Sequence, residues 1–361
     1  MNSRFDPSTH GTPSVVPLPR SRGPRSAGLL EALQAVSSRS PAAPTAPAPD
    51  RTGPATPRID SLVDDDLHLA LYLAYELHYR GLPGVPDEAE WDPTILGMRR
   101  ELETAFEGAL RAAVEMPPMP ADADIGSMLR TEAREGDGAL SRYLQRSASV
   151  AQFREFVIHR SAYHLKEADP HSFAIPRLAG PAKAAMVEIQ SDEYGAGDAG
   201  WMHSYLFATT MHGLGLDPTY GAYLHRIPGH TLATVNAMSM FGLHRRLRGA
   251  AVGHLAMFEL TSTLPNRRYG NGLRRLGFDE HTTRFFDEHV EADAVHEAIA
   301  TEDLVGSLVA VEPALARDVV FGARALSLLD ALSSLAMLRA WRYGRTSLRR
   351  SHAAQKARRA A

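Results

Sequence analysis

The sequence predicts an all-α protein. Apolar residues recur at the three- and four-residue spacing of amphipathic helices over most of the chain after the first 58 residues, and Gly or Pro separates most of these segments. Alternating apolar and polar runs bounded by turn residues, which would indicate strands, are nearly absent. The chain has 361 residues and 44% of them are hydrophobic, enough to bury a large core. We therefore expect one main helical bundle with additions.

Residues 1–58 are expected to be a disordered segment rich in Pro, Ala, Ser and Arg. They hold eleven of the chain's 24 prolines and few large apolar residues, so little in them could build a packed core. One stretch differs, because Leu29 to Val36 could form a short helix.

Residues 59–148 are predicted to form an N-terminal helical portion. A first helix begins at Asp64, where three consecutive acids suit a helix N-terminus. A second runs from about Thr94 to Val114 and stops before the proline cluster that ends at Pro120. Shorter helices are expected within 125–147.

Residues 149–345 are predicted to form the main core, and 346–361 a basic tail. The last core helix is strongly apolar and has no chemistry of its own. The expected helices run over about 150–168, 181–194, 200–214, 217–226, 230–247, 250–263, 281–302 and 315–343.

The connection P-N-R-R-Y-G-N-G precedes the helix predicted at 281–302. Its Arg267, Arg268 and Tyr269 could recognise a carboxylate or phosphate. At least as good an interpretation is a turn whose arginines pair with acidic groups of the protein.

Composition excludes several classes of protein. The chain has no cysteine, so disulfides, Cys-based zinc sites, iron–sulfur clusters and cysteine nucleophiles are excluded. The net charge is −3 although both ends are basic, so the body is acidic, which argues against a nucleic acid partner. We identify no apolar run that spans a bilayer and no signal segment, and we expect a cytoplasmic protein without a membrane partner.

The stretch F-F-D-E-H-V-E-A-D-A-V-H-E, residues 285–297, has the strongest signal for a functional site. At 100° per residue, His289, Asp293 and His296 lie within about 60° of one another on one helix face. Glu291 lies on the opposite side and is expected at the surface. Two imidazoles and a carboxylate on one face favour a metal site over an ordinary solvated helix.

Further ligands should come from other helices, because three groups cannot fill the coordination shells of two metals. Glu259 lies in the apolar stretch A-V-G-H-L-A-M-F-E-L-T, where an isolated acid is costly unless it is paired or metal-bound. Glu167 ends an otherwise apolar helix, Glu193 lies in S-D-E-Y-G, and His203 begins the next helix. Salt-bridged or surface positions remain an alternative for each glutamate.

Hard oxygen donors and imidazoles without sulfur suit iron or manganese better than a structural zinc ion. Ferritin-like di-iron proteins place carboxylates and histidines on facing helices in this way. The other histidines considered are expected to be structural or to support the ligands: His159, His164, His212, His225, His230, His244 and His254.

The chain resembles the bacterial family described as iron-containing redox enzymes, within the haem-oxygenase-like di-iron oxidases and oxygenases. The resemblance covers about 60–345. It is carried by D-D-D-L-H-L-A-L-Y-L-A-Y-E-L-H-Y-R-G, K-E-A-D-P-H-S-F-A-I-P-R-L, S-D-E-Y-G, T-S-T-L-P-N-R-R-Y-G-N-G and F-F-D-E-H-V-E-A-D-A-V-H-E. It implies a haem-oxygenase-like helical bundle with an additional N-terminal helical portion, whose seven-helix core holds two irons.

The resemblance also implies a ligand set, with intervals similar to those of the family's N-oxygenating branch. The implied metal ligands are Glu167, Glu193, His203, Glu259, His289, Asp293 and His296. Many relatives have an acid where this chain has Gly200. Glu193 could replace that acid, and Glu188 or Asp192 compete with Glu193 for the role.

The main hypothesis is a non-haem di-iron oxidase or oxygenase, a monooxygenase among the precedents. It would bind two Fe(II) ions and use O2 to oxidise a small-molecule substrate. N-oxygenation is slightly favoured over oxidative carbon–carbon cleavage or desaturation. The alternatives are a haem-binding or haem-degrading protein of the same fold, and a non-enzymatic helical scaffold. The substrate, a requirement for an external electron donor and the formation of a homodimer are left open by the sequence.

Overall fold

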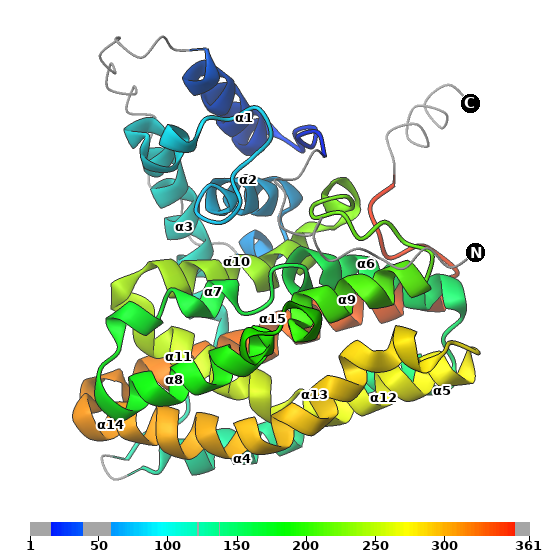
Figure 1. The fold of residues 1–361 in the computed structure, drawn as a ribbon. Helices are drawn as coiled ribbons and strands as arrows, with labels where there is room; N and C mark the ends of the chain where they lie inside the picture. Colours follow the sequence, from blue (N-terminus) through cyan, green and yellow to red (C-terminus); the bar gives the residue numbers. More distant parts are fainter. Residues whose placement is uncertain (1–15, 39–58, 121–122, 137, 351–361) are drawn as a thin grey trace.

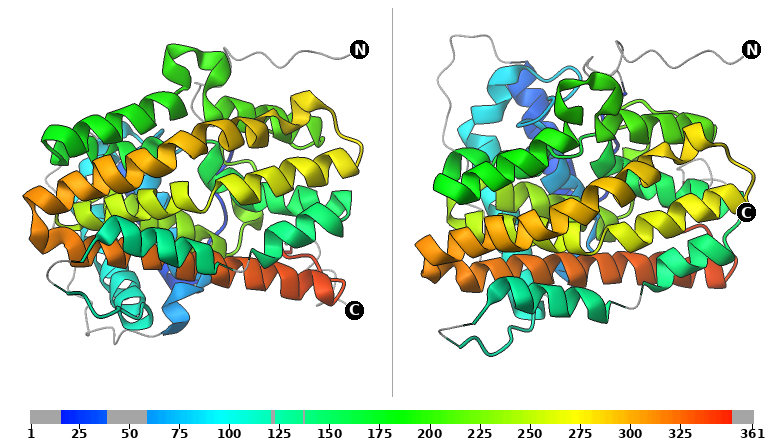
Figure 2. Two further views of the ribbon diagram at one scale, coloured as in Figure 1. Left: turned by 90° about the horizontal axis from the view of Figure 1, so that it is seen from below. Right: turned by 60° about the horizontal axis from the view of Figure 1, so that its bottom comes forward.

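The computed structural model describes residues 16–38, 59–120, 123–136 and 138–350, except for the side chains of residues 292–294. Over these ranges the chain is helical and contains no strand, which confirms the all-α prediction. The longer helices lie side by side in a bundle, and helices α1 to α3 form a layer against one face of it (Figures 1 and 2).

The α-helices begin and end at the following residues. They are α1 (Pro24–Ser37), α2 (Asp65–Glu76), α3 (Pro93–Ala113), α4 (Ile125–Glu135), α5 (Ala139–Arg146), α6 (Val150–His164), α7 (Asp169–Ser172), α8 (Gly180–Glu193), α9 (His203–Gly213), α10 (Gly229–Leu243), α11 (Arg248–Leu260), α12 (Thr263–Arg275), α13 (Glu280–Ala298), α14 (Ser307–Val311) and α15 (Ala316–Arg342). A π-helical segment, Ile299–Gly306, joins α13 to α14.

Helices α11 and α15 cross with their backbones in close contact. A Cβ atom added at Gly253 of α11 would lie 1.8 Å from the carbonyl oxygen of Val319. One added at Gly322 of α15 would lie 2.0 Å from the carbonyl oxygen of Ala250. Only glycine fits at such a backbone approach. This crossing fixes the position of α11, the helix that carries Glu259.

Helix α1 lies in the segment that was expected to be disordered outside one short helix, and for Pro24–Gly28 that prediction is wrong. The helix contains the expected short helix at Leu29 to Val36 and extends it toward the N-terminus. Leu29 and Leu33 are 0% exposed. The Asp66 carboxylate accepts hydrogen bonds of 2.8 Å from the backbone N–H groups of Arg25 and Ser26 at the start of α1. The rest of the predicted segment, 1–15 and 39–58, lies outside the described residues.

Helix α12 occupies the stretch that was interpreted as a connection. Pro265 lies in its first turn, where a missing N–H is tolerated. Gly272 is a packing residue, because a Cβ there would lie 2.7 Å from the carbonyl oxygen of Leu144. Arg268 donates a hydrogen bond of 3.0 Å to Ser141 of α5. The glycines therefore mark close contact between helices and not a turn.

Two further differences concern helix assignment. The helix expected at 217–226 is mostly turns, with only a 3₁₀ segment at Leu224–Arg226. The predicted core helix at 315–343 is α15, and by length and composition Pro313–Arg342 could cross a membrane, which the sequence analysis did not identify. Half of its most apolar window is buried in the protein, as in a core helix, so this single helix is weak evidence for a membrane span.

The start of the basic tail contacts the core. The carboxylate of Glu155 in α6 accepts hydrogen bonds from the Ser347 hydroxyl at 2.7 Å and from the Trp341 ring N–H at 2.8 Å. Residues 351–361 of the tail lie outside the described part of the chain.

We predict that Gly253→Ala destabilises the protein by about 1 to 3 kcal/mol, because the added methyl group must push the α15 backbone away. Gly97 of α3 is the matched control, since a Cβ there would have no atom within 4 Å. Gly97→Ala should raise the free energy of unfolding by about 0.5 to 1 kcal/mol. Urea unfolding of both variants checks this, and equal effects at the two sites would contradict the assigned crossing.

The second prediction concerns acid sensitivity. Burial lowers the pKa of His68 to about 4, and its ring accepts from the Asn236 amide at 3.2 Å and donates to the carbonyl of Ser61 at 2.8 Å. The unfolded chain therefore binds the proton more readily. Stability should fall as pH drops from about 6.5 to about 4, by up to about 3 kcal/mol for this group.

His68→Gln should flatten this decline, measured as free energies of unfolding between pH 7.5 and pH 4.5. The control is His281→Gln at an exposed position of α13, which should follow the unmodified protein. An unchanged slope in His68→Gln would contradict the prediction.

Candidate metal centre

Six of the seven predicted ligand residues meet inside the bundle. Each is at most 7% exposed. Glu167 lies in the turn after α6, Glu193 at the end of α8 and His203 at the start of α9. Glu259 lies at the end of α11, His289 in the middle of α13 and His296 in the last turn of α13. The seventh, Asp293, lies on α13 between the two histidines, and its side chain lies outside the described residues.

The six residues form two adjacent groups. Glu167, Glu193, His203 and His289 each offer a ligand atom within 4.8 Å of the others. Glu193, Glu259 and His296 do the same. Glu193 belongs to both groups, so the two candidate positions for a metal adjoin at its carboxylate.

Glu167 is held by two histidines. Its Oε1 lies 2.6 Å from Nδ1 of His164 and 3.7 Å from Nε2 of His289. Its Oε2 is buried and has no hydrogen-bond partner within the described residues. Burial alone would raise the pKa of Glu167, but the attraction and hydrogen bonds of His164 and His289 outweigh burial and lower it. A carboxylate that is ionised, buried and incompletely hydrogen-bonded is suited to bind a cation.

The other two glutamates also contact histidines. Glu193 lies 2.8 Å from Nδ1 of His203, and this contact lowers the pKa of Glu193 although burial opposes it. Glu259 lies 3.4 Å from Nδ1 of His296. Burial, with the charge of Glu193 adding to it, raises the pKa of Glu259 despite this histidine. Three carboxylates in such proximity repel one another, and a bound metal ion would relieve the repulsion.

The backbone and a neighbouring acid orient the two histidines of α13. Nδ1–H of His289 donates to the carbonyl oxygen of Phe285 at 2.8 Å, which directs Nε2 toward Glu167. Nε2 of His296 lies 3.1 Å from the Asp192 carboxylate, so Nδ1 faces Glu259. Burial would lower the pKa of His296, but Glu259 and Asp192 raise it to about 9. Such outer contacts fix which ring nitrogen is available to a metal.

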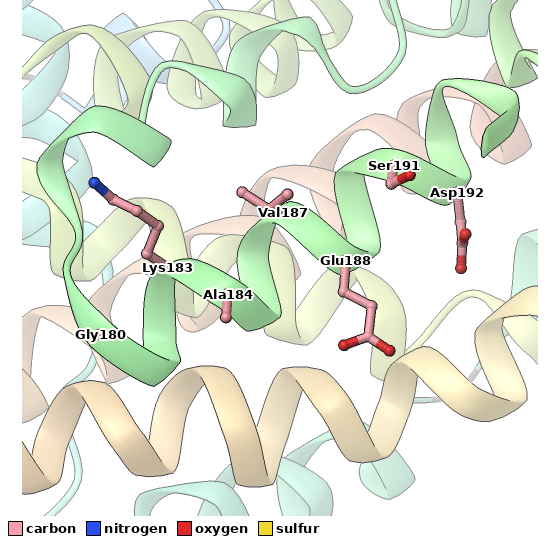
Figure 3. Close-up of a pocket in the computed structure, with 7 residues that line it drawn as sticks. All are labelled: Gly180, Lys183, Ala184, Val187, Glu188, Ser191 and Asp192. Atoms are coloured by element: carbon pink, nitrogen blue, oxygen red, sulfur yellow. The ribbon is translucent and has the colours of Figure 1, made fainter. Parts of the chain in front are cut away.

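The acids that competed with Glu193 lie elsewhere. Glu188 lines an open groove of about 540 Å³ along the outer face of α8, together with Lys183 and Val187 (Figure 3). Asp192 lines the same groove, its side chain is 51% exposed, and it reaches the cluster only through His296. Glu193 alone of the three joins the two groups of potential ligands.

Aromatic rings close the Glu167 side of the cluster. The ring of His164 lies 4.9 Å from that of Phe207 and 5.0 Å from that of Phe285, and the His203 and His289 rings lie 4.3 Å apart. Apolar walls of this kind exclude water and strengthen interactions between charges. His164 was expected to be structural or supporting, and its contact with Glu167 agrees with the three-residue spacing between them.

The donor set fits iron. Oxygen and imidazole nitrogen are the ligands present, sulfur is absent from the set, and all donors come from rigid helices or their ends. The unsatisfied oxygen of Glu167 and the repulsion among the three glutamates are both explained by a cation at this position.

Comparison with known proteins agrees with the site. Residues 154–331, which contain all seven predicted ligands, match the model of the iron-containing redox enzyme family. A nitrosourea synthase from Streptomyces achromogenes subsp. streptozoticus is 28% identical over 156 residues, which are 43% of this chain and 33% of that protein. The matched part of this chain therefore spans about a third of the length of the relative.

A solved structure is also similar. The crystal structure of a CADD-like protein of unknown function from Nostoc punctiforme aligns with a TM-score of 0.46 and 18% sequence identity. The alignment covers 58% of this chain and 93% of that one. This likeness is too weak to add to the assignment.

The family match and the buried cluster of carboxylates and imidazoles lead to one assignment. Residues 154–331, about half of the chain, belong to the iron-containing redox enzyme family, and the described residues have that family's haem-oxygenase-like, all-helical fold.

Proposed function

We propose that the protein is a non-haem di-iron oxidase or oxygenase that uses O2 to oxidise a small organic molecule. The observation that carries this proposal is the position of Glu193 between two groups of potential ligands. One metal position needs a single convergent set of side chains, whereas a shared carboxylate between two sets is typical of di-iron carboxylate proteins. The described geometry thus supports about two ions per chain.

The first ion would be held by Glu167, His203 and His289, with Glu193 between the ions. The second would be held by Glu259 and His296. Asp293, which the resemblance implies as a further ligand, lies on α13 between His289 and His296. Each ion would keep room for another ligand, as O2 or substrate requires.

When bound, Fe(II) supplies the electrons for the reduction of O2. The protein orients the ligand side chains and limits the access of water to the centre. Phe285 and Asp192 hold the imidazoles of His289 and His296 in the orientation that presents the second nitrogen to the metal. Phe207 and Phe285 keep bulk water from the Glu167 side.

N-oxygenation is the reaction that we favour. It is supported by the similarity to a nitrosourea synthase, whose named product is a urea with an N-nitroso group. Oxidative carbon–carbon cleavage and desaturation are the other reactions within the proposal. The substrate in this proposal is a small molecule and not a nucleic acid or membrane. An external electron donor would be needed where the substrate does not supply every electron that reduces O2.

A haem-binding function fits the site less well. Haem needs one axial histidine and an apolar cleft, and three buried glutamates in contact with histidines would be costly in such a cleft. A Soret band on adding haem, with no binding of free iron, would favour haem over the di-iron proposal.

The first prediction from this proposal concerns stability. Mn(II), which does not react with O2 under these conditions, should stabilise the metal-free protein by about 2.7 kcal/mol at a free concentration 100 times its Kd. Glu193→Gln should lose most of this gain, because one shared carboxylate contributes to both ions. Glu188→Gln, in the outer groove, is the matched control and should keep it. Thermal and urea unfolding with and without Mn(II) provide the measurement, and equal gains in both variants would count against the centre.

The second prediction concerns iron and oxygen. Protein reconstituted with Fe(II) without air should bind about two ions per chain and give a transient visible absorption on mixing with O2. His289→Ala and Asp293→Ala should bind less iron and lose the transient. Glu291→Ala, exposed on the same helix, is the control and should behave as the unmodified protein. A folded protein that binds no iron, or undiminished iron in both His289→Ala and Asp293→Ala, would refute the proposal.

A further inference from the structure

The turn that carries Glu167 needs support from outside itself. It spans residues 165–168 between α6 and α7. Ala168 in this turn has φ of 74°, in the left-handed region that residues with a Cβ seldom adopt. Such a conformation persists where surrounding contacts hold it. The direction of the Glu167 side chain therefore depends on the contacts that hold the neighbouring residues in place.

Lys166, the residue before Glu167, binds to α2 of the N-terminal layer through its side chain. Its side chain is 0% exposed and its ammonium group forms an ion pair with the carboxylate of Glu76. The same ammonium lies over the ring of Tyr79, 4.0 Å from the centroid, and 4.7 Å from that of Tyr72. A buried ammonium is stable only with such compensation.

The buried negative charge of Glu76 is also balanced by its contacts. Its second oxygen accepts a hydrogen bond of 2.6 Å from the hydroxyl of Tyr220, and the residue is 2% exposed. Charge, hydrogen bond and aromatic faces therefore enclose one ion pair between α2 and the turn. Neither partner was among the predicted site residues.

Two further contacts join the same helix region to the same turn. Arg80 donates a hydrogen bond of 3.1 Å to the carbonyl oxygen of Leu165. The hydroxyl of Tyr72 donates one of 3.3 Å to the carbonyl oxygen of Ala162 at the end of α6. The backbone on the N-terminal side of Glu167 is thus tied to the N-terminal layer at three successive places.

We propose that Glu76 is a positioning residue for the metal centre, which acts through Lys166 to hold the turn so that the Glu167 carboxylate faces the other ligands. Because Lys166 and Glu167 are adjacent, fixing the Lys166 side chain toward α2 fixes the peptide from which Glu167 projects. The inference rests on the proposed metal function of Glu167. It assigns to the N-terminal layer a role in shaping the site.

The alternative is that the pair only stabilises the fold. A buried ion pair is a weak source of stability, since well-packed apolar side chains of similar volume often replace one without loss. Stability and metal affinity can therefore be separated in the variant Glu76→Met/Lys166→Met. If the pair only stabilises the fold, the double variant should lose stability. If the pair positions Glu167, the double variant should lose metal affinity.

The test uses the full-length protein and Mn(II) as the probe, titrated without air. The double variant should unfold at or above the unmodified protein's temperature when metal-free, and should bind Mn(II) about 10- to 100-fold more weakly, as expected on loss of an outer support. Tyr75→Phe is the matched control. Tyr75 lies on the same helix and donates to Glu103 at 3.1 Å, away from the turn, so its removal should leave the affinity unchanged.

Tyr220→Phe keeps the experiment decisive if the double variant does not fold. It removes one hydrogen bond to the buried Glu76 and leaves the ion pair. Its thermal stability should fall about as much as that of Tyr75→Phe, which loses an equivalent hydrogen bond to Glu103, but only Tyr220→Phe should show a severalfold loss of Mn(II) affinity. Unchanged affinity in a folded double variant, or in Tyr220→Phe where the double variant does not fold, would overturn the inference while the metal centre stands. An unmodified protein that binds no Mn(II) or Fe(II) would instead overturn the proposed function, and the inference with it.

Discussion

The structure depends on the burial of three carboxylates in one cluster, in which Glu193 offers a ligand atom within 4.8 Å of one from Glu167 and of one from Glu259. Glu167, Glu193 and Glu259 are each 7% exposed or less, and the surrounding helices offer them histidines. Removing an ionised carboxylate from water is expensive, and like charges in a poorly polarisable interior add to the cost. The rest of the bundle has to be rigid enough to impose this arrangement. Two contacts provide this rigidity. They are the close crossing of α11 and α15 and the ion pair between α2 and the turn after α6.

Much of the site could be predicted because it obeys short periodic rules. His289 and His296 share a face of α13 since positions seven apart on a helix nearly coincide, and the isolated acid Glu259 in an apolar stretch indicated a buried partner. The resemblance to the family supplied the distant residues Glu167, Glu193 and His203, which periodicity could not connect. Whether the seven residues bind metal stays a prediction, and the Asp293 side chain lies beyond the described part of the chain.

The predictions from sequence were wrong for segments in which tertiary contacts override the local conformational preference of the residues. Prolines around α1 suggested disorder, yet Leu29 and Leu33 are buried in the N-terminal layer and Asp66 binds the start of the helix. The stretch that forms α12 was interpreted as a connection, although its Gly272 lies against the backbone of α5 in a contact between two helices. A single sequence gives the same letter for a glycine in a connection and for one in a helix contact. The partner of Lys166 was likewise hidden, because Glu76 lies 90 residues away.

The distance in sequence between Glu76 and Lys166 affects which fragments of this protein could fold. The family match begins at residue 154, after the whole of α2, so the matched segment includes Lys166 but not Glu76. A fragment made to those limits would expose the apolar face of α10 that α2 covers, and would leave an ammonium group without its counter-charge in an interior lined by Tyr220. We therefore expect the unit that folds alone to include α2 and to be larger than the segment matched by the family.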